Sequence, residues 1–89
     1  MKNIKQLSSF ISQLQTQTEV EQLLFELLTS SEINVLSKRW RILNLLNEGN
    51  TQRDIAKELS VSLCKVTRGA KILKNKNTII NKYFNNCFI

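Results

Sequence analysis

The sequence predicts an all-α protein of six short helices, and three features support this prediction. Apolar residues recur at intervals of three and four along most of the chain, as they do on one face of an α-helix. Proline is absent, and the alternating β-branched residues that would indicate strands are scarce. With 89 residues, the chain has the size of one small domain. We therefore expect residues 1–89 to form a single helical domain.

Two short helices are expected at the start of the chain. Thr18 stands three residues before Glu21, the spacing at which a hydroxyl and a carboxylate together cap a helix start. This spacing predicts that the second helix begins near residue 18. The apolar stripes of the two helices are Ile4, Leu7, Phe10 or Ile11 and Leu14, followed by Val20, Leu23, Leu24, Leu27 and Leu28.

A longer third helix follows. Thr29 and Glu32 repeat the capping spacing at its start, and Gly49 is suited to the left-handed residue that ends many helices. We interpret Trp40, the only tryptophan, as a packing residue in the core of a dimer rather than as a functional residue. The stripe consists of Ile33, Leu36, Trp40, Leu43 and Leu46.

Residues 51–73 have the pattern of a helix-turn-helix, with caps at Thr51 and Ser62. Such a unit needs a small residue where its helices cross and apolar residues that join them. Ser60 occupies the turn position that usually favours glycine, because the backbone there is left-handed, so we expect mild strain or a different turn. A simple helical hairpin could show a similar pattern. The residues that match are Ile55, Ala56, Leu59, Val61 and Val66.

Gly69 departs from the helix-turn-helix pattern, which normally has a bulky apolar residue at this position. A glycine inside a helix costs about 1 kcal/mol relative to alanine. We therefore expect that close helix packing or a ligand requires the absence of a side chain at this position.

A break at residues 75–77 precedes the last apolar stripe, which consists of Ile79, Ile80, Tyr83, Phe84 and Cys87.

The whole net charge of +6 lies in the last third of the chain. Residues 1–58 contain seven basic and all seven acidic residues, whereas residues 59–89 contain six basic residues and no acid. A segment of one charge sign is typical of a surface that binds a polyanion, usually nucleic acid. A solvated surface that keeps the protein in solution would have the same composition.

Several function classes are disfavoured by what the sequence lacks. Histidine, the commonest catalytic base and metal ligand, is absent, and no glycine-rich phosphate loop occurs. Cys64 and Cys87 are too few for a zinc site, and we expect no disulfide between them. We see neither a membrane span nor a signal peptide, so we expect a cytoplasmic protein that is not an enzyme and needs no metal or cofactor.

The outward face of the second helix of the motif suits DNA. A reading helix contacts base edges mainly with its N-terminal half, and lysine can donate to guanine acceptors. Residues at the start of the first helix suit phosphates. For each of them, a solvated surface residue is the alternative interpretation. The candidate DNA-binding residues are Lys38, Gln52, Arg53, Leu63, Cys64, Lys65, Thr67 and Lys71.

Three segments resemble the Trp repressor family. They are LLTSSEINVLSKRWRIL at residues 27–43, EGNTQRDIAKEL at 48–59 and VSLCKVTRGAKILK at 61–74. The most specific element is the run Thr67, Arg68, Gly69 in the reading helix. The resemblance covers about half of the chain strongly. It implies an intertwined, all-helical homodimer that binds a palindromic operator when L-tryptophan is bound, with reading helices one DNA turn apart, as described for the Trp repressor itself.

The resemblance also implies the ligand site. Arg39 and Arg68 match the two arginines between which the family holds the indole, and a guanidinium pairs well with the ligand carboxylate. Gly69 matches a glycine of the same pocket. Leu28 and Thr29 match the partner-chain segment whose carbonyls accept from the ligand ammonium.

The chain departs from the family pattern at two positions of this site. Ile72 replaces a polar residue, often serine, that helps to hold the ammonium group, and Glu26 is a candidate to replace it. Lys65 stands where some members of the family have threonine, so the operator sequence need not be shared with them.

From the resemblance as a whole we predict a tryptophan-controlled repressor. The alternatives are a regulator of the same fold that is constitutive or gated by another ligand, and a helical interaction module without a role at DNA.

Overall fold

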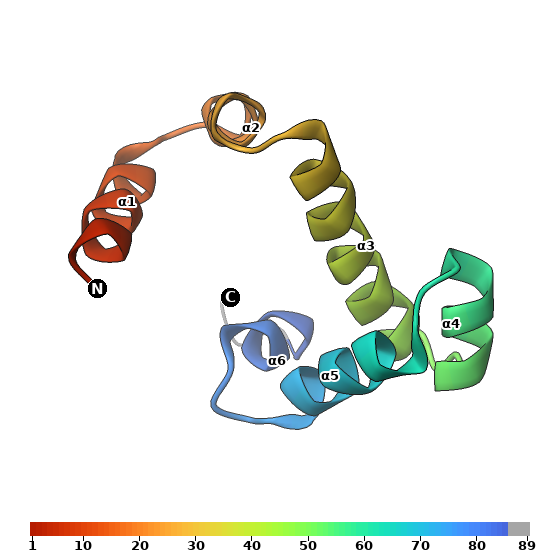
Figure 1. Cartoon of the computed structure of the whole chain (residues 1–89). Coiled ribbons are helices and arrows are strands. Elements are labelled where there is room, and N and C mark those ends of the chain that lie inside the picture. Colours follow the sequence, from red (N-terminus) through yellow and green to blue (C-terminus); the bar gives the residue numbers. More distant parts are fainter. Residues whose placement is uncertain (86–89) are drawn as a thin grey trace. The chain divides into compact units, whose positions relative to one another are not determined.

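The computed structural model describes residues 1–85, and all regular structure in that range is helical (Figure 1). This confirms the predicted all-α class and its six helices. Cys87, assigned to the last apolar stripe, lies outside the described residues. The helices are α1 (Lys2–Gln13), α2 (Gln17–Leu27), α3 (Ser30–Asn47), α4 (Gln52–Leu59), α5 (Leu63–Lys74) and α6 (Ile79–Phe84).

The chain forms two compact units, Met1–Asn34 and Val35–Ile89. The first contains α1, α2 and the start of α3, and the second contains the rest of α3 with α4 to α6. Whether both units together act as one domain, as expected from the length, stays a prediction. Over residues 1–85, no helix is both long and apolar enough to cross a membrane.

The start of α2 corrects one prediction. The capping box consists of Thr16 and Glu19, so the helix begins two residues before the predicted Thr18 and Glu21 pair. Thr16 has an extended backbone, which lets its side chain accept from the Glu19 N–H at 3.1 Å. The Glu19 carboxylate accepts from the N–H groups of Gln15 and Thr16 at 3.0 and 3.1 Å. Thr18 instead lies inside the first turn.

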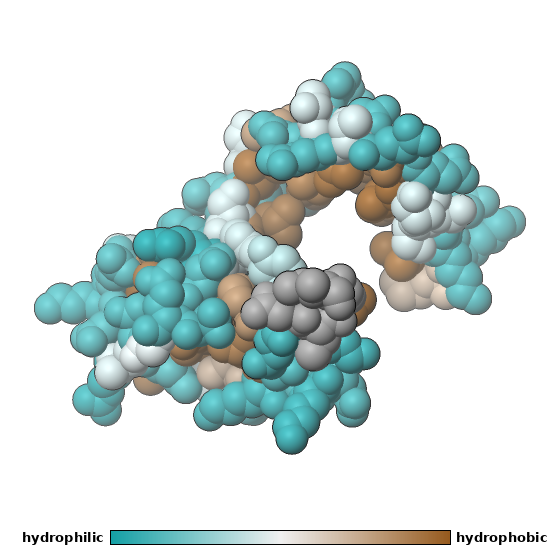
Figure 2. Space-filling model, turned by 180° about the vertical axis from the view of Figure 1, so that it is seen from behind, coloured by the Kyte–Doolittle hydropathy of each residue, from teal (hydrophilic) through white to brown (hydrophobic). Residues whose placement is uncertain are grey.

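The first unit covers its apolar side chains only in part. Neither α1 nor α2 contains a buried residue. Ile4 is 54% exposed, Phe25 62% and Leu27 56%. Figure 2 shows hydrophobic residues open to solvent on the face that it presents. The first unit therefore leaves part of its apolar surface exposed.

Both ends of α3 agree with the prediction. The Thr29 N–H donates to the Glu32 carboxylate at 2.8 Å, and the Glu32 N–H donates to the Thr29 hydroxyl at 3.2 Å. Gly49 has a φ of +98° and closes the helix, with its N–H bonded to the Leu46 carbonyl at 3.1 Å.

The core of the second unit lies where α3, α4 and α5 meet. Ile55 and Val66 are fully buried, and the cluster joins the two helices of the motif to the end of α3. Around it pack Ala56, Leu59 and Val61, the other positions that the helix-turn-helix pattern selects. The buried members are Ile42, Leu45, Ile55 and Val66.

Trp40 packs within its own chain against α6. Its ring stacks on Phe84 with centroids 5.7 Å apart and lies 5.7 Å from the Tyr83 ring. This contact holds α6 beside α3, although Trp40 remains 44% exposed. Packing is therefore part of its role, and its burial in a dimer core stays a prediction.

Candidate functional site

The helix-turn-helix is built by two caps and a left-handed turn. Thr51 accepts from the Asp54 N–H at 3.1 Å to start α4, and Ser62 accepts from the Lys65 N–H at 3.4 Å to start α5. Between them Ser60 has φ 54° and ψ 47°, the left-handed conformation expected at this turn position. The Val61 N–H then donates to the Ala56 carbonyl at 3.0 Å, which closes the corner.

A polar contact fixes the angle between the two helices of the motif. The Thr67 hydroxyl of α5 donates to the Gln52 side-chain oxygen of α4 at 2.8 Å. The sequence predicts both residues as direct DNA contacts. The bond gives them a positioning role, because it orients α5 on α4, and it leaves the Thr67 methyl group and the Gln52 amide nitrogen for other contacts.

One face of α5 brings several predicted DNA-binding residues together. They line an open depression of about 360 Å³ on the surface. Cys64 in this face is an exposed, free thiol, and Leu63 is 46% exposed. Arg53 is exposed at the start of α4 and Lys38 is half-buried on α3, and neither lines this depression. The lining residues are Leu63, Cys64, Thr67, Arg68 and Lys71.

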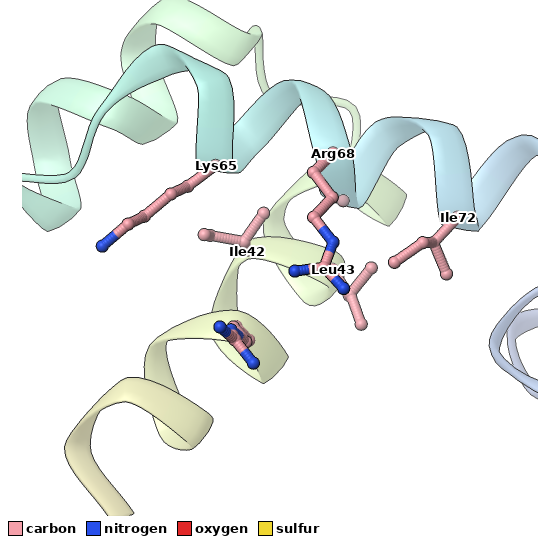
Figure 3. A pocket seen from close by; sticks show the side chains of 7 residues that line it. Ile42, Leu43, Lys65, Arg68 and Ile72 are labelled. Carbon is pink, nitrogen blue, oxygen red and sulfur yellow. The ribbon is translucent and has the colours of Figure 1, made fainter. Parts of the chain in front are cut away.

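A second cavity, of about 110 Å³, lies between α3 and α5 (Figure 3). Four of the six predicted ligand residues, Arg39, Arg68, Gly69 and Ile72, line it. Leu28 and Thr29 belong to the other unit, so their part in the site stays a prediction. Glu26, considered as a replacement for the lost polar residue, accepts from Gln22 on α2 at 2.8 Å.

Gly69 allows α5 to approach α3 closely. A β-carbon at this position would lie 3.0 Å from Ile42 Cγ2 and 3.5 Å from Leu46 Cδ1. Ile42 is only 2% exposed and has little room to move. Of the two reasons expected for this glycine, close packing is therefore visible directly, and the same close approach forms the floor of the cavity.

The charges of the cavity are one-sided. Arg39, Lys65 and Arg68 line it, and its remaining lining is apolar: Ile42, Leu43, Gly69 and Ile72. Figure 3 shows Lys65 and Arg68 on α5 opposite Ile42 and Leu43 on α3. None of the three cations is paired with a carboxylate in residues 1–85. The cavity can therefore hold an apolar body against its walls and an anionic group between its cations.

The family follows from comparison with known proteins. The model of the family described as "Trp repressor protein" matches residues 2–87. This chain belongs to the Trp repressor family. Three proteins named "Trp operon repressor homolog", from three strains of Xylella fastidiosa, are each 50% identical over 52 residues. The matched stretch covers 57% of this chain and 56% of those relatives, so it spans about half of their length. No solved structure gives a significant match.

Three residues that line the cavity are not assigned to a ligand site by the sequence. Leu43 belongs to the predicted apolar stripe of the third helix, Ile42 has no predicted role, and Lys65 is predicted only as a DNA contact. The spacing indicates that Lys65 belongs with the predicted ligand residues of α5, because residues 65, 68, 69 and 72 share one face of a helix. Residues 39, 42 and 43 do the same on α3. In residues 1–85, no cluster of potential metal ligands occurs.

Proposed function

We propose that this chain is a DNA-binding transcriptional repressor of the cytoplasm. It acts as a homodimer, reads a palindromic operator with α5, and binds the operator when L-tryptophan occupies the cavity between α3 and α5. It carries out no catalysis. Two observations support this proposal: the chain belongs to the Trp repressor family, and the cations of α5 have no carboxylate partner in residues 1–85.

One observation carries the proposal: Arg68 lines both the cavity and the depression on the outer face of α5. Four of the seven lining residues of the cavity are on α5, the helix expected to read DNA. A ligand in the cavity therefore contacts that helix directly. Such a ligand regulates DNA binding if it binds more tightly to the helix position that fits DNA.

The lining suits an aromatic amino acid with a carboxylate. An indole ring would contact the apolar side chains of Ile42, Leu43 and Ile72 and stack beside the arginine side chains. Arg39, Lys65 and Arg68 would compete for the carboxylate, and a guanidinium can bind it through two parallel hydrogen bonds. Gly69 would leave room for the ring.

The cavity is incomplete within one unit. Its volume of about 110 Å³ is below the roughly 300–1,000 Å³ of typical small-molecule sites. Additional walls must therefore come from residues outside its present lining. We propose that Leu28 and Thr29 of a second copy supply these walls and the carbonyl groups that accept from the ammonium.

A second candidate ligand is an aromatic carboxylate without an amino group. The seven lining residues contain no carboxylate, hydroxyl or amide side chain that accepts from an ammonium group, and Ile72 occupies the position where the family often has serine. If the carbonyls of a second copy do not compensate, the cavity recognises the anion and the ring only.

Calorimetry at several temperatures separates these possibilities. L-tryptophan is titrated into the protein, with indole-3-propionate and L-phenylalanine as comparisons. We expect saturable binding of one tryptophan per chain, tighter than binding of phenylalanine. Tighter binding of indole-3-propionate that also promotes DNA binding would favour the second candidate. No heat with any of the three at millimolar concentration would contradict ligand control by this cavity.

DNA binding is tested by selection from random duplexes with and without L-tryptophan, at one stated salt concentration. We expect a palindromic sequence to be enriched only with the ligand. The Arg68→Ala variant should lose ligand response and bind the selected DNA weakly. The control is Arg41→Ala, which changes an exposed arginine that lines neither the cavity nor the depression on α5. Unchanged ligand affinity of Arg68→Ala would refute the assignment of this residue to the cavity.

A further inference from the structure

A second basic surface lies beyond the reading face of α5. Lys74 at the end of α5, Lys76 in the following turn and Lys82 on α6 line an open depression, together with Asn81 and Asn85. We propose that this depression, the C-terminal lysine cluster, binds phosphates of the DNA backbone beside the bases that α5 reads. This inference rests on the proposed DNA-binding function.

The charge of the cluster is unopposed. None of the three lysines has a carboxylate partner in residues 1–85, and no acidic residue follows Glu58 in the sequence. A lysine ammonium is a compact, strongly hydrated charge on a flexible stem. It is therefore better suited to contact an exposed phosphate oxygen than to line a dry, shaped pocket. The wide, open form of the depression fits the backbone of a duplex rather than an enclosed small anion.

Hydrogen bonds hold the cluster in a defined arrangement. The Thr78 hydroxyl donates to the Ile72 carbonyl at 2.9 Å, and it accepts from the Asn81 N–H at 3.1 Å to cap α6. The Asn81 amide nitrogen donates to the Leu73 carbonyl at 2.6 Å. These bonds tie the turn and α6 to the end of α5, so Lys74, Lys76 and Lys82 line the same depression.

The length of α5 places the cluster at the edge of the groove. Its 12 residues span about 18 Å, whereas the major groove is about 12 Å wide and about 8.5 Å deep. We take α5 to enter the groove at an angle, with its N-terminal half among the bases, so that its last turn lies outside the groove near the phosphates. Lys71 of the reading face and Lys74 are three residues apart, so the basic surface is continuous along the helix.

The test compares two variants that each lose two positive charges. One is Lys76→Gln/Lys82→Gln, and the matched control is Lys2→Gln/Lys5→Gln, which changes two exposed lysines of α1. DNA affinity is measured by fluorescence anisotropy between about 50 and 200 mM salt, on the selected duplex and on an unrelated one. Thermal melting and L-tryptophan titration verify that both variants fold and bind ligand like the unchanged protein.

We expect the cluster variant to lose about tenfold in affinity on both duplexes, because phosphates carry no sequence information. Its slope of log affinity against log salt should become shallower by about 1.8 per chain, since each phosphate contact contributes about 0.9. Equal affinities and slopes for the two variants would overturn this inference and leave the proposed function intact. A loss on the selected duplex alone would mean base reading and would also overturn it. If the unchanged protein binds no DNA at all, both proposals fail.

Discussion

Arg68 lies where two faces of α5 meet, and this position makes it part of two surfaces. Residues 63, 64, 67 and 71 form the outer face with Arg68, and residues 65, 69 and 72 form the cavity face with it. Under the proposed function, we expect a side chain shared in this way to link an anion in the cavity to the surface that meets DNA. Lys65 belongs to the cavity face, although its position near the start of α5 also suits base contact.

Replacing Lys65 should therefore change two measurements. In Lys65→Ala the affinity for L-tryptophan should fall, because one of three cations around the carboxylate is lost. Base preference at one or two positions of the operator should change by about 1–3 kcal/mol. Calorimetry and binding to single-base operator variants measure the two effects. Lys57→Ala, which changes an exposed lysine of α4 outside the cavity and the depression, is the control for charge. An equal loss of affinity on every sequence would make Lys65 a phosphate contact.

Gly69 offers a test of close packing. Gly69→Ala should destabilise the fold, because the new methyl group meets the buried Ile42 Cγ2 at 3.0 Å. Overpacking costs about 1–3 kcal/mol, and the better helix propensity of alanine returns about 1 kcal/mol. Urea unfolding measures the difference. The double variant Gly69→Ala/Ile42→Leu lacks the Cγ2 methyl group of Ile42 that makes this contact. It should therefore recover part of the lost free energy of unfolding. If Gly69→Ala were more stable than the unchanged protein, this would contradict the prediction and show that α3 shifts at little cost to accommodate the methyl group.

At the scale of the element, the turn of the helix-turn-helix stores strain at Ser60. Its φ of 54° is left-handed, which costs a residue with a β-carbon roughly 1–2 kcal/mol. Ser60→Gly should therefore raise the free energy of unfolding by about 1 kcal/mol, less the greater entropy of glycine in the unfolded chain. Denaturant unfolding tests this, with Ser37→Gly in the middle of α3 as a control that should destabilise. A less stable Ser60→Gly would indicate that the serine side chain holds the turn.

The starts of α2 and α3 should make helix stability depend on acid. The backbone N–H of Gln15, followed by that of Thr16, holds the pKa of Glu19 below its usual 4.5. The backbone N–H and the hydroxyl of Thr29 lower the pKa of Glu32 in the same way. Because the folded pKa values are depressed, this stabilisation is complete above pH 4.5. It is lost as the pH falls through the folded values.

Thermal melting followed by circular dichroism at a series of pH values measures this dependence. The melting temperature should fall with acid below about pH 4.5, and Glu19→Gln should weaken the fall because it keeps a hydrogen-bonding side chain without a titrating group. Glu21→Gln, outside the capping box, is the control. A pH dependence of Glu19→Gln identical to that of the unchanged protein would contradict the role of the cap.

At the scale of the whole molecule, one chain buries too little apolar surface for its size. Among the described residues six hydrophobic side chains are buried, whereas twelve large ones are exposed, including Phe25, Leu36 and Trp40. The exposed side chains lie on both units. A second copy would cover such surfaces, which is why we propose a homodimer as the functional form.

Dimerisation should couple folding to protein concentration. If folding and association occur together, the denaturation midpoint rises as the concentration of chains is raised. Unfolding at concentrations spanning about a hundredfold, together with analytical ultracentrifugation, tests this. Phe25→Glu should shift the equilibrium toward monomer, whereas Glu21→Lys on the same helix changes charge without touching an apolar side chain. A midpoint independent of concentration and a monomeric mass would refute the dimer.

Local sequence patterns predict most of the helix boundaries of this protein. Helix periodicity, the caps at Thr29, Thr51 and Ser62, and the left-handed residues Ser60 and Gly49 act over three or four neighbouring residues, so they can be recognised without a fold. The start of α2 was misplaced because Thr16 and Thr18 both precede a glutamate by three, and only the backbone conformation shows which threonine caps. Arg39, Arg68, Gly69 and Ile72 were assigned to one site by their resemblance to the family.

Which of these residues come into contact depends on how the helices pack. Three contacts depend on how α5 packs on α3 and α4. Lys65 lines the cavity, Thr67 donates to Gln52, and Ile42 packs closely against Gly69. The C-terminal lysine cluster likewise arises because the turn after α5 returns the chain to the end of that helix. Contacts of this kind join residues distant in sequence, and the packing of buried side chains sets them. A local pattern holds no information about that packing.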